Sequence, residues 1–108
     1  MDDYREEVKA VVDALVLPMP GVVGGRAFGY PAYKVNRKMF MFVGGAGIGI
    51  KLGEARAAAV VAAHPAAALF QPVEGTTWKA WVSIDHADPA HYRDDIDLIE
   101  EAMQFVAS

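Results

Sequence analysis

The sequence predicts an α+β fold, a single two-layer domain in which an antiparallel sheet of about five to six strands packs against N- and C-terminal helices. Two observations carry this prediction. Apolar residues recur at helical spacing at both ends of the chain, whereas the middle third alternates apolar and polar residues between glycine and asparagine turns. Strands that follow one another through short turns favour an antiparallel sheet over a parallel one. With 108 residues, the chain is expected to form one domain over residues 1–108.

The first helix is predicted over residues 2–17. Its apolar face comprises Tyr4, Val8, Val11, Val12 and Leu15. Asp2 and Asp3 suit its start, because carboxylates cap a helix N-terminus and complement its dipole. Pro18 ends the helix because the residue before a proline disfavours helical geometry.

Four short strands are predicted next, at about 24–28, 31–35, 38–43 and 47–51. The tightest turn is Asn36-Arg37, since asparagine tolerates a positive φ. A positive φ at Arg37 would cost about 1–2 kcal/mol, which leaves the turn type open. The glycine-rich segment 44–51 is interpreted as a hairpin turn, because it lacks the spacing of phosphate-binding and dinucleotide-binding loops.

An alanine-rich helix is predicted from Gly53 to Ala63, followed by one or two strands at residues 69–70 and 78–84. Alternation along the second run places Trp78 and Trp81 on opposite faces. Asp88-Pro89 is a cap residue followed by a first-turn proline and predicts the start of the last helix. The predicted core comprises Val8, Val12, Leu15, Phe28, Phe40, Phe42, Ile50, Leu69, Val82, Ile96, Ile99 and Met103.

The composition excludes several classes of protein. The chain has no cysteine, which rules out disulfides, thiolate metal sites and a cysteine nucleophile. It has no apolar run of membrane-spanning length, and its N-terminus is too acidic for a signal peptide, so a cytoplasmic protein with no membrane partner is expected.

The net charge of −4 is distributed unevenly. Residues 22–51 contain five cationic side chains and no acidic one, namely Arg26, Lys34, Arg37, Lys38 and Lys51. A local cationic face of this kind can meet phosphate or an acidic partner. The alternative is that acidic residues are simply disfavoured in strands.

Catalysis and metal binding find little support in the sequence. The few serines and threonines lie near no base or oxyanion motif, so an enzyme is not expected. His86 and His91 lack the spacing of a helical metal motif, and a loop followed by a helix cap accounts for their segment. His64 is interpreted as a partner of the preceding helix dipole. We therefore expect no metal and no cofactor.

Residues 25–33 (GRAFGYPAY) and 35–40 (VNRKMF) resemble the TfoX N-terminal domain family, and later segments continue the pattern in order. This family is related to the MmcQ/YjbR group, whose members are often labelled DNA-binding. The resemblance implies a small α+β domain with a nucleic-acid-binding or transcription-related accessory role. The chain departs from the family pattern at Arg37, where a hairpin glycine is frequent, and at Ala27, where a larger apolar residue often occurs.

A non-catalytic binding module is the leading functional hypothesis, with nucleic acid as the partner. Cations hold phosphates and exposed rings stack on unpaired bases. The candidate binding residues are Arg26, Tyr30, Lys34, Arg37, Lys38, Lys51 and Lys79. The alternative is a protein-interaction or small-ligand-binding domain that acts through a sheet edge or an aromatic surface, including as a homodimer.

Overall fold

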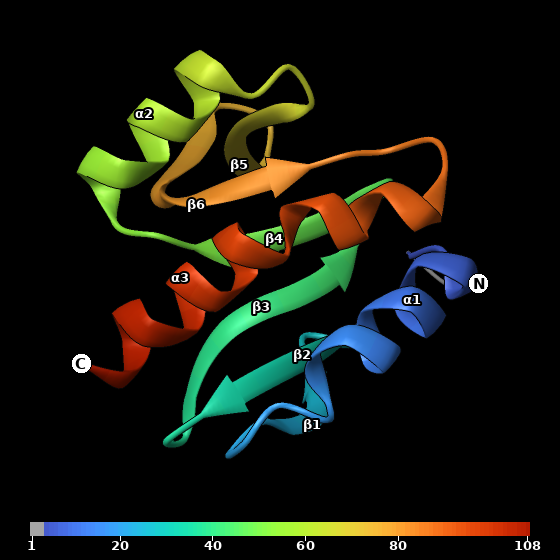
Figure 1. Ribbon diagram of the computed structural model, residues 1–108. Coiled ribbons are helices and arrows are strands. Elements are labelled where there is room, and N and C mark those ends of the chain that lie inside the picture. Colours follow the sequence, from blue (N-terminus) through green and yellow to red (C-terminus); the bar gives the residue numbers. More distant parts are fainter. Residues whose placement is uncertain (1–3) are drawn as a thin grey trace.

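The computed structural model describes residues 4–108 and forms one sheet with helices packed against it (Figure 1). The elements in chain order are α1 (Glu6–Val16), β1 (Val23–Ala27), β2 (Tyr30–Val35), β3 (Lys38–Gly44), β4 (Gly47–Lys51), α2 (Glu54–Ala63), β5 (Ala67–Val73), β6 (Thr76–Ile84), the 3₁₀ helix η1 (Pro89–Asp95) and α3 (Ile96–Ala107). The cap residues predicted at Asp2 and Asp3 lie outside the described part of the chain.

The sheet is antiparallel throughout, with the strand order β1-β2-β3-β4-β6-β5. Helix α3 crosses β2, β3 and β4, α2 packs on β5 and β6, and α1 packs mainly against η1 (Figure 1). The predicted α+β class, with terminal helices against an antiparallel sheet, is therefore confirmed. The first and last helices meet through η1 rather than along α3.

Turn chemistry explains why the β2–β3 hairpin matches its prediction. Asn36 has φ +52° and Arg37 has φ +66°. Two consecutive left-handed residues define a type I′ turn, whose twist matches that of the flanking strands. The turn type that the sequence left open is thus settled, and Arg37 adopts a conformation that a side chain disfavours.

The last helix begins where the sequence predicts. The Asp88 carboxylate accepts the Ala90 N–H at 3.0 Å, and Pro89 occupies the first turn. The segment from Pro89 to Asp95 is a tight 3₁₀ helix, and α-helical geometry begins only at Ile96. This tight segment determines where the Asp95 side chain points.

A β-bulge in β3 modifies the predicted core. Tyr33 lies opposite Met41 and Lys34 opposite Met39, so Phe40 has no partner on β2. The extra residue lets both Phe40 and Met41 enter the helix-covered core, which strict alternation forbids.

The predicted core is confirmed for most residues but not for all. The confirmed residues, buried in the core between the helices and the sheet, are Val8, Val12, Phe40, Ile50, Val82 and Ile99. Leu15, Leu69, Ile96 and Met103 are only half-buried. Phe42 is buried on the opposite face of the sheet. The prediction that Phe28 belongs to the core is wrong, since its side chain is 89% exposed.

Among residues 4–108, no helix has the length and apolar character needed to cross a membrane.

Candidate nucleic-acid interface

The sheet face opposite α1 and α3 carries an aromatic cluster. Phe42 and Trp81 are buried there against Ala32. The Phe42 ring centroid lies 4.9 Å from that of Phe70 and 5.5 Å from that of Trp81. Rings at these separations attract one another beyond the area they bury. The face is therefore an ordered apolar surface.

Gly49 on β4 makes this arrangement possible. A Cβ atom at Gly49 would lie 2.3 Å from two carbons of the Phe42 ring. Any side chain at this position would displace the ring. The Phe42 ring consequently lies directly against the β4 backbone.

A register shift between β5 and β6 corrects the predicted placement of the tryptophans. Leu69 pairs with Val82, whereas the next residue, Phe70, pairs with Trp78. The shift breaks the alternation along β6 and brings the Trp78 and Trp81 rings to 6.3 Å from each other. Trp78 also contacts Phe70, with ring centroids 5.3 Å apart. The two tryptophans therefore belong to one aromatic surface rather than to opposite faces.

A hollow of about 740 Å³ opens on this surface. We call it the aromatic groove and define it by Phe28, Tyr30, Phe42, Phe70 and Trp78. Phe28 lies in the β1–β2 turn with φ +55°, an unusual conformation for a bulky residue. Because Phe28 lies in this turn and not on a strand, its side chain is exposed and not part of the core, and its ring lines the groove.

Five candidate cations gather at the end of the sheet that holds the β2–β3 turn. Lys51 pairs with Trp81, one residue beyond the Ile50–Met41 pair, so it lies near the start of β3. Lys79 lies on β6 beyond Trp81, toward the same end. We call this group the basic end and define it by Lys34, Arg37, Lys38, Lys51 and Lys79.

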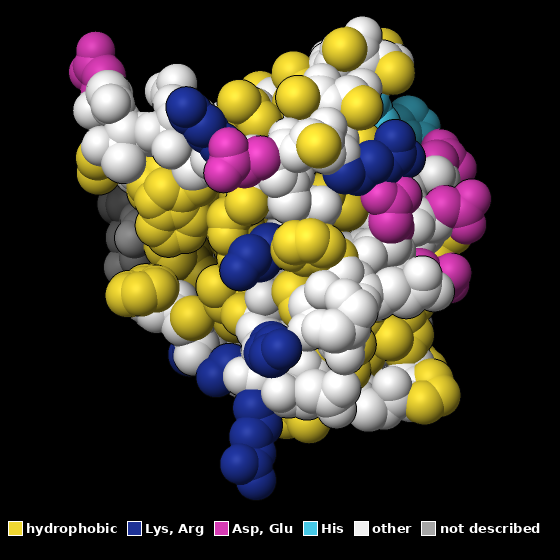
Figure 2. Space-filling model, turned by 90° about the vertical axis from the view of Figure 1, so that its left-hand side faces the viewer, with side chains coloured by type: hydrophobic (Ala, Val, Ile, Leu, Met, Phe, Trp, Pro, Cys, Tyr) yellow, Lys and Arg dark blue, Asp and Glu magenta, His cyan; other side chains and the backbone are white. Residues whose placement is uncertain are grey.

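Figure 2 looks onto this side of the molecule, where Lys and Arg side chains run down the middle of the view and acidic ones lie toward its upper and right-hand margins. Lys38 and Lys51 line a second hollow of about 530 Å³, together with Met39, Trp81 and Phe105. Met39 and Trp81 also pack with the aromatic cluster. The basic end and the aromatic surface are therefore contiguous.

The cations of the basic end have no carboxylate partner among residues 4–108. Two cations outside the basic end are paired instead: Lys9 lies 2.7 Å from Asp13, and Arg56 lies 2.6 Å from Glu101. The hydrogen bond to Asp13 raises the pKa of Lys9. The charges of the basic end remain available for an anionic partner.

Two of the predicted site residues lie elsewhere. Arg26 pairs with Pro31 near the β1–β2 turn, at the opposite end of β2 from Arg37. Its Nη1 donates to the Gly29 carbonyl at 3.0 Å, which ties the guanidinium to its own turn. Tyr30 lines the aromatic groove and not the basic end. The structure thus divides the predicted residues between a cationic group and an aromatic one.

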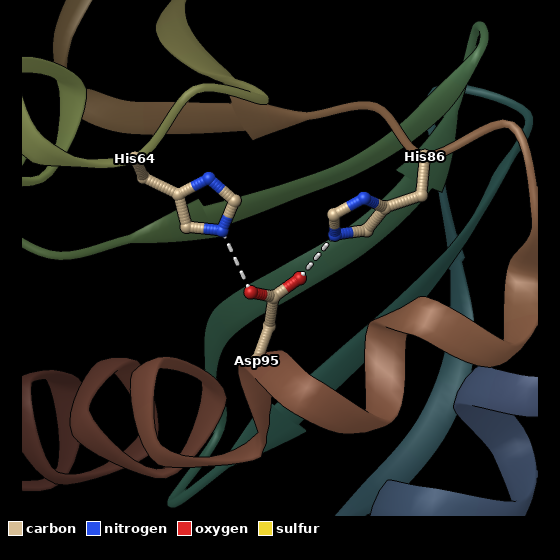
Figure 3. A group of neighbouring side chains, drawn as sticks. All are labelled: His64, His86 and Asp95. Carbon is tan, nitrogen blue, oxygen red and sulfur yellow. Dashed lines mark hydrogen bonds and ion pairs between the residues drawn. The ribbon is translucent and has the colours of Figure 1, made fainter.

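Sequence reasoning missed a polar cluster on the helix-covered side. The Asp95 carboxylate is buried and lies between two imidazoles, with Oδ1 2.8 Å from His64 Nε2 and Oδ2 2.7 Å from His86 Nε2 (Figure 3). His64 follows α2, so its expected role at the helix dipole is replaced by this contact. One signal was available: Asp95 lies between Tyr92 and Ile99 on the apolar side of the last helix.

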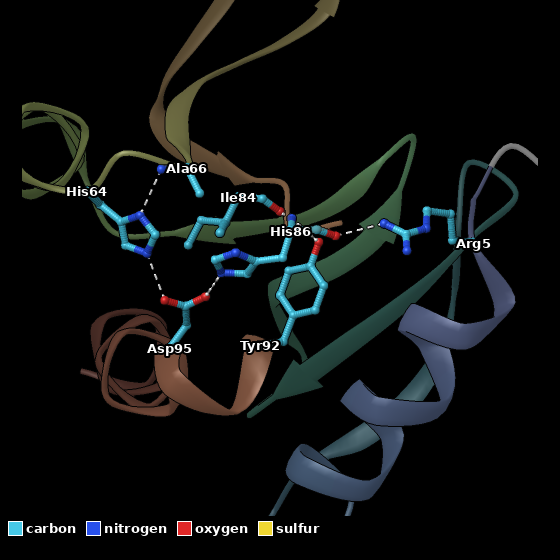
Figure 4. A network of polar contacts seen from close by, with 7 residues as sticks. All are labelled: Arg5, His64, Ala66, Ile84, His86, Tyr92 and Asp95. Carbon is cyan, nitrogen blue, oxygen red and sulfur yellow. Dashed lines mark hydrogen bonds and ion pairs between the residues drawn. The ribbon is translucent and has the colours of Figure 1, made fainter. Parts of the chain in front are cut away.

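Hydrogen bonds around the cluster fix the loop that carries His86 (Figure 4). Arg5 donates to the carbonyls of His86 and Ala87 at 2.8 Å each. The Tyr92 hydroxyl accepts the His86 N–H at 2.9 Å and donates to the Ile84 carbonyl at 3.3 Å. Burial raises the pKa of Tyr92, which keeps this hydroxyl protonated and able to donate.

These features define a small α+β domain with an aromatic sheet face and a cationic edge. Residues 17–104 match the YjbR family, and the chain belongs to that family. This match bears out the resemblance to the MmcQ/YjbR group. No curated protein and no solved structure matches the chain significantly.

Proposed function

We propose that the protein is a non-catalytic nucleic-acid-binding module for single strands, with phosphates on the basic end and unpaired bases in the aromatic groove. The observation that carries this proposal is the set of five cations with no carboxylate partner among residues 4–108, contiguous with an aromatic surface on which the Phe28 and Trp78 rings are exposed. Stacking on aromatic side chains tolerates any base, while cations follow the backbone. A cytoplasmic, transcription-related accessory role is the finer form of this proposal, and it rests on the TfoX-like residues 25–33 and 35–40.

The charge distribution sets the expected strength of binding. The net charge of −4 opposes non-specific association, so affinity depends on the local basic end. If four of its cations contact phosphates, the logarithm of the binding constant for a single strand should fall with the logarithm of salt concentration with a slope of about −3. Duplex DNA with the same contacts would give a slope nearer −4.

The experiment titrates labelled single-stranded and duplex DNA against the protein at several salt concentrations. The triple variant Lys34→Gln, Arg37→Gln, Lys38→Gln should fold normally, because exposed substitutions shift stability by less than about 0.5 kcal/mol each. It should flatten the single-strand slope by about two units. Arg93→Gln is the control, since Arg93 is exposed on η1 and has no place in the basic end. The absence of binding by the wild type at low salt would reject the proposal.

The size of the groove favours a second candidate function. A hollow of about 740 Å³ is large enough for a small aromatic molecule, and its walls are mainly apolar. A small-ligand or partner-binding domain, including a homodimer, would bind through the rings of the aromatic groove and would not need the cations of the basic end. Binding that is insensitive to salt, is lost in Phe70→Ala and persists in the triple variant would favour this candidate. Sedimentation at several concentrations distinguishes the homodimer from ligand binding.

A further inference from the structure

The cluster of His64, His86 and Asp95 plays no part in the proposed interface, and its chemistry points elsewhere. The side chains come from three separate segments: the end of α2, the loop after β6 and the end of η1 (Figure 3). Their ligand atoms lie within 4.8 Å of one another. We propose that these three residues form a binding site for a divalent transition metal of the zinc type.

The donor set fits such an ion. Two imidazole nitrogens and one carboxylate are common zinc ligands, and three protein ligands leave a fourth position for water. Both histidines direct the same ring atom, Nε2, toward the carboxylate. The carboxylate is 5% exposed, while the histidine side chains are 21% and 16% exposed. A cation can therefore reach the cluster from the histidine side and meet a buried carboxylate.

The backbones of both histidines are already fixed. The His64 N–H donates to the Val60 carbonyl at 2.8 Å, and the His64 carbonyl accepts the Ala67 N–H at 3.1 Å. The His86 N–H and carbonyl are held by Tyr92 and Arg5. Ligands on a fixed backbone lose little freedom when they bind, which favours affinity.

Metal binding requires a modest rearrangement of the ligand atoms. Bonds of about 2.0–2.1 Å in a tetrahedral geometry place ligand atoms about 3.3 Å apart. The two hydrogen-bonded pairs, 2.8 Å and 2.7 Å apart, must therefore separate by about 0.5 Å, whereas the most distant pair of ligand atoms, which lies within 4.8 Å, must approach by at most about 1.5 Å. We expect rotation of the imidazole rings about their side-chain bonds to supply a change of this size.

A proton must also move, and this step provides a reporter. The Ala66 N–H donates to His64 Nδ1 at 3.1 Å, so the His64 proton is on Nε2 and points toward Asp95. A metal on Nε2 transfers the ring proton to Nδ1, where it faces the Ala66 N–H. The Ala66 hydrogen bond must then break. His86 Nδ1 has no such donor among the described contacts.

The test uses the full chain without a histidine tag and Co²⁺ as a spectroscopic substitute for Zn²⁺. The wild type should bind one Co²⁺ per chain with the intense visible absorption of a tetrahedral site, and Zn²⁺ should displace it. His86→Gln and His64→Gln should each weaken Co²⁺ binding at least about tenfold, the loss that even outer-shell partners produce. His91→Gln is the matched control, because His91 is exposed and its ring lies 5.8 Å from the His86 ring.

Backbone amide NMR separates this site from adventitious binding. The Ala66 amide resonance of the wild type should shift upon addition of Zn²⁺ as its hydrogen bond is lost, and it should stay in place in His86→Gln. No saturable Co²⁺ binding by the wild type would overturn the proposal. Equal affinities of His86→Gln and His91→Gln, or an Ala66 amide that does not respond to bound Zn²⁺, would overturn it as well.

Discussion

Replacement of Arg37 by glycine should stabilise the protein and weaken its binding to nucleic acid. Arg37 has φ +66° in the β2–β3 turn, and its side chain is exposed. A side chain in this conformation costs about 1–2 kcal/mol, and glycine removes that strain. Asn-Gly is also the preferred pair for a type I′ turn. The same substitution deletes one charge of the basic end.

The size of the stability gain follows from two opposing terms. Relief of strain contributes about 1–2 kcal/mol, while the greater freedom of glycine in the unfolded chain removes about 0.5–1 kcal/mol. The free energy of unfolding should therefore rise by roughly 0.7 kcal/mol. For a domain near 100 residues this corresponds to an increase in Tm of about 3–5 °C. Loss of one phosphate contact should flatten the single-strand salt slope by about 0.7.

Thermal and urea unfolding measure the change in stability, and DNA titration on the same preparation measures the change in salt slope. Arg37→Lys is the control, because it keeps the charge and the strained backbone and should leave Tm and salt slope near those of the wild type. A glycine variant less stable than the wild type would show that the guanidinium stabilises the fold and refute the strain argument. An unchanged salt slope would remove Arg37 from the interface.

Three further predictions concern the scaffold. Gly49→Ala should displace the Phe42 ring and lower the free energy of unfolding by about 1–3 kcal/mol in urea; an unchanged value would mean that the ring does not depend on the bare β4 backbone. Burial and the hydrogen bond to Asp13 raise the pKa of Tyr33, so the folded state retains this proton at higher pH than the unfolded state. The contribution of the Tyr33 proton to the free energy of unfolding should be complete below about pH 10 and should decline above it by up to about 1.4 kcal/mol per pH unit. This decline should be absent from the Tyr33→Phe variant. Parallel curves of stability against pH for the two proteins would contradict the prediction. Arg5→Ala should remove three hydrogen bonds to loop carbonyls, destabilise the protein by about 1–3 kcal/mol and accelerate amide exchange in residues 85–88, whereas unaltered exchange would assign the loop's order to other contacts.

Local rules predicted much of the sheet. The Asn36-Arg37 turn and the glycines of 44–49 punctuate the strands, so the predicted strands in this region agree with the structure to within about a residue at each end. The failures occur where alternation is interrupted. The bulge at Phe40 and the register shift beside Trp78 depend on partner strands, and nothing in the local sequence reports them.

The candidate sites were only partly predictable for the same reason. The absence of acidic residues from 22–51 indicated a basic surface, yet strand direction decides that Arg26 lies at the opposite end from Arg37. The metal-type cluster joins positions 64, 86 and 95, and only the folded sheet brings these segments together.

The strand order has a consequence for how the chain folds. Strands β1 to β4 pair with their sequence neighbours, so they can assemble through short loops. The pairing of β4 with β6 is different, because Ile48 meets Ile84 and Ile50 meets Val82 across more than thirty residues that include α2. Closing that loop lowers the conformational entropy of the chain before the core gains any stabilising contacts. We expect truncation of Val82, which is buried on β6 and pairs with Ile50 across that loop, to slow refolding.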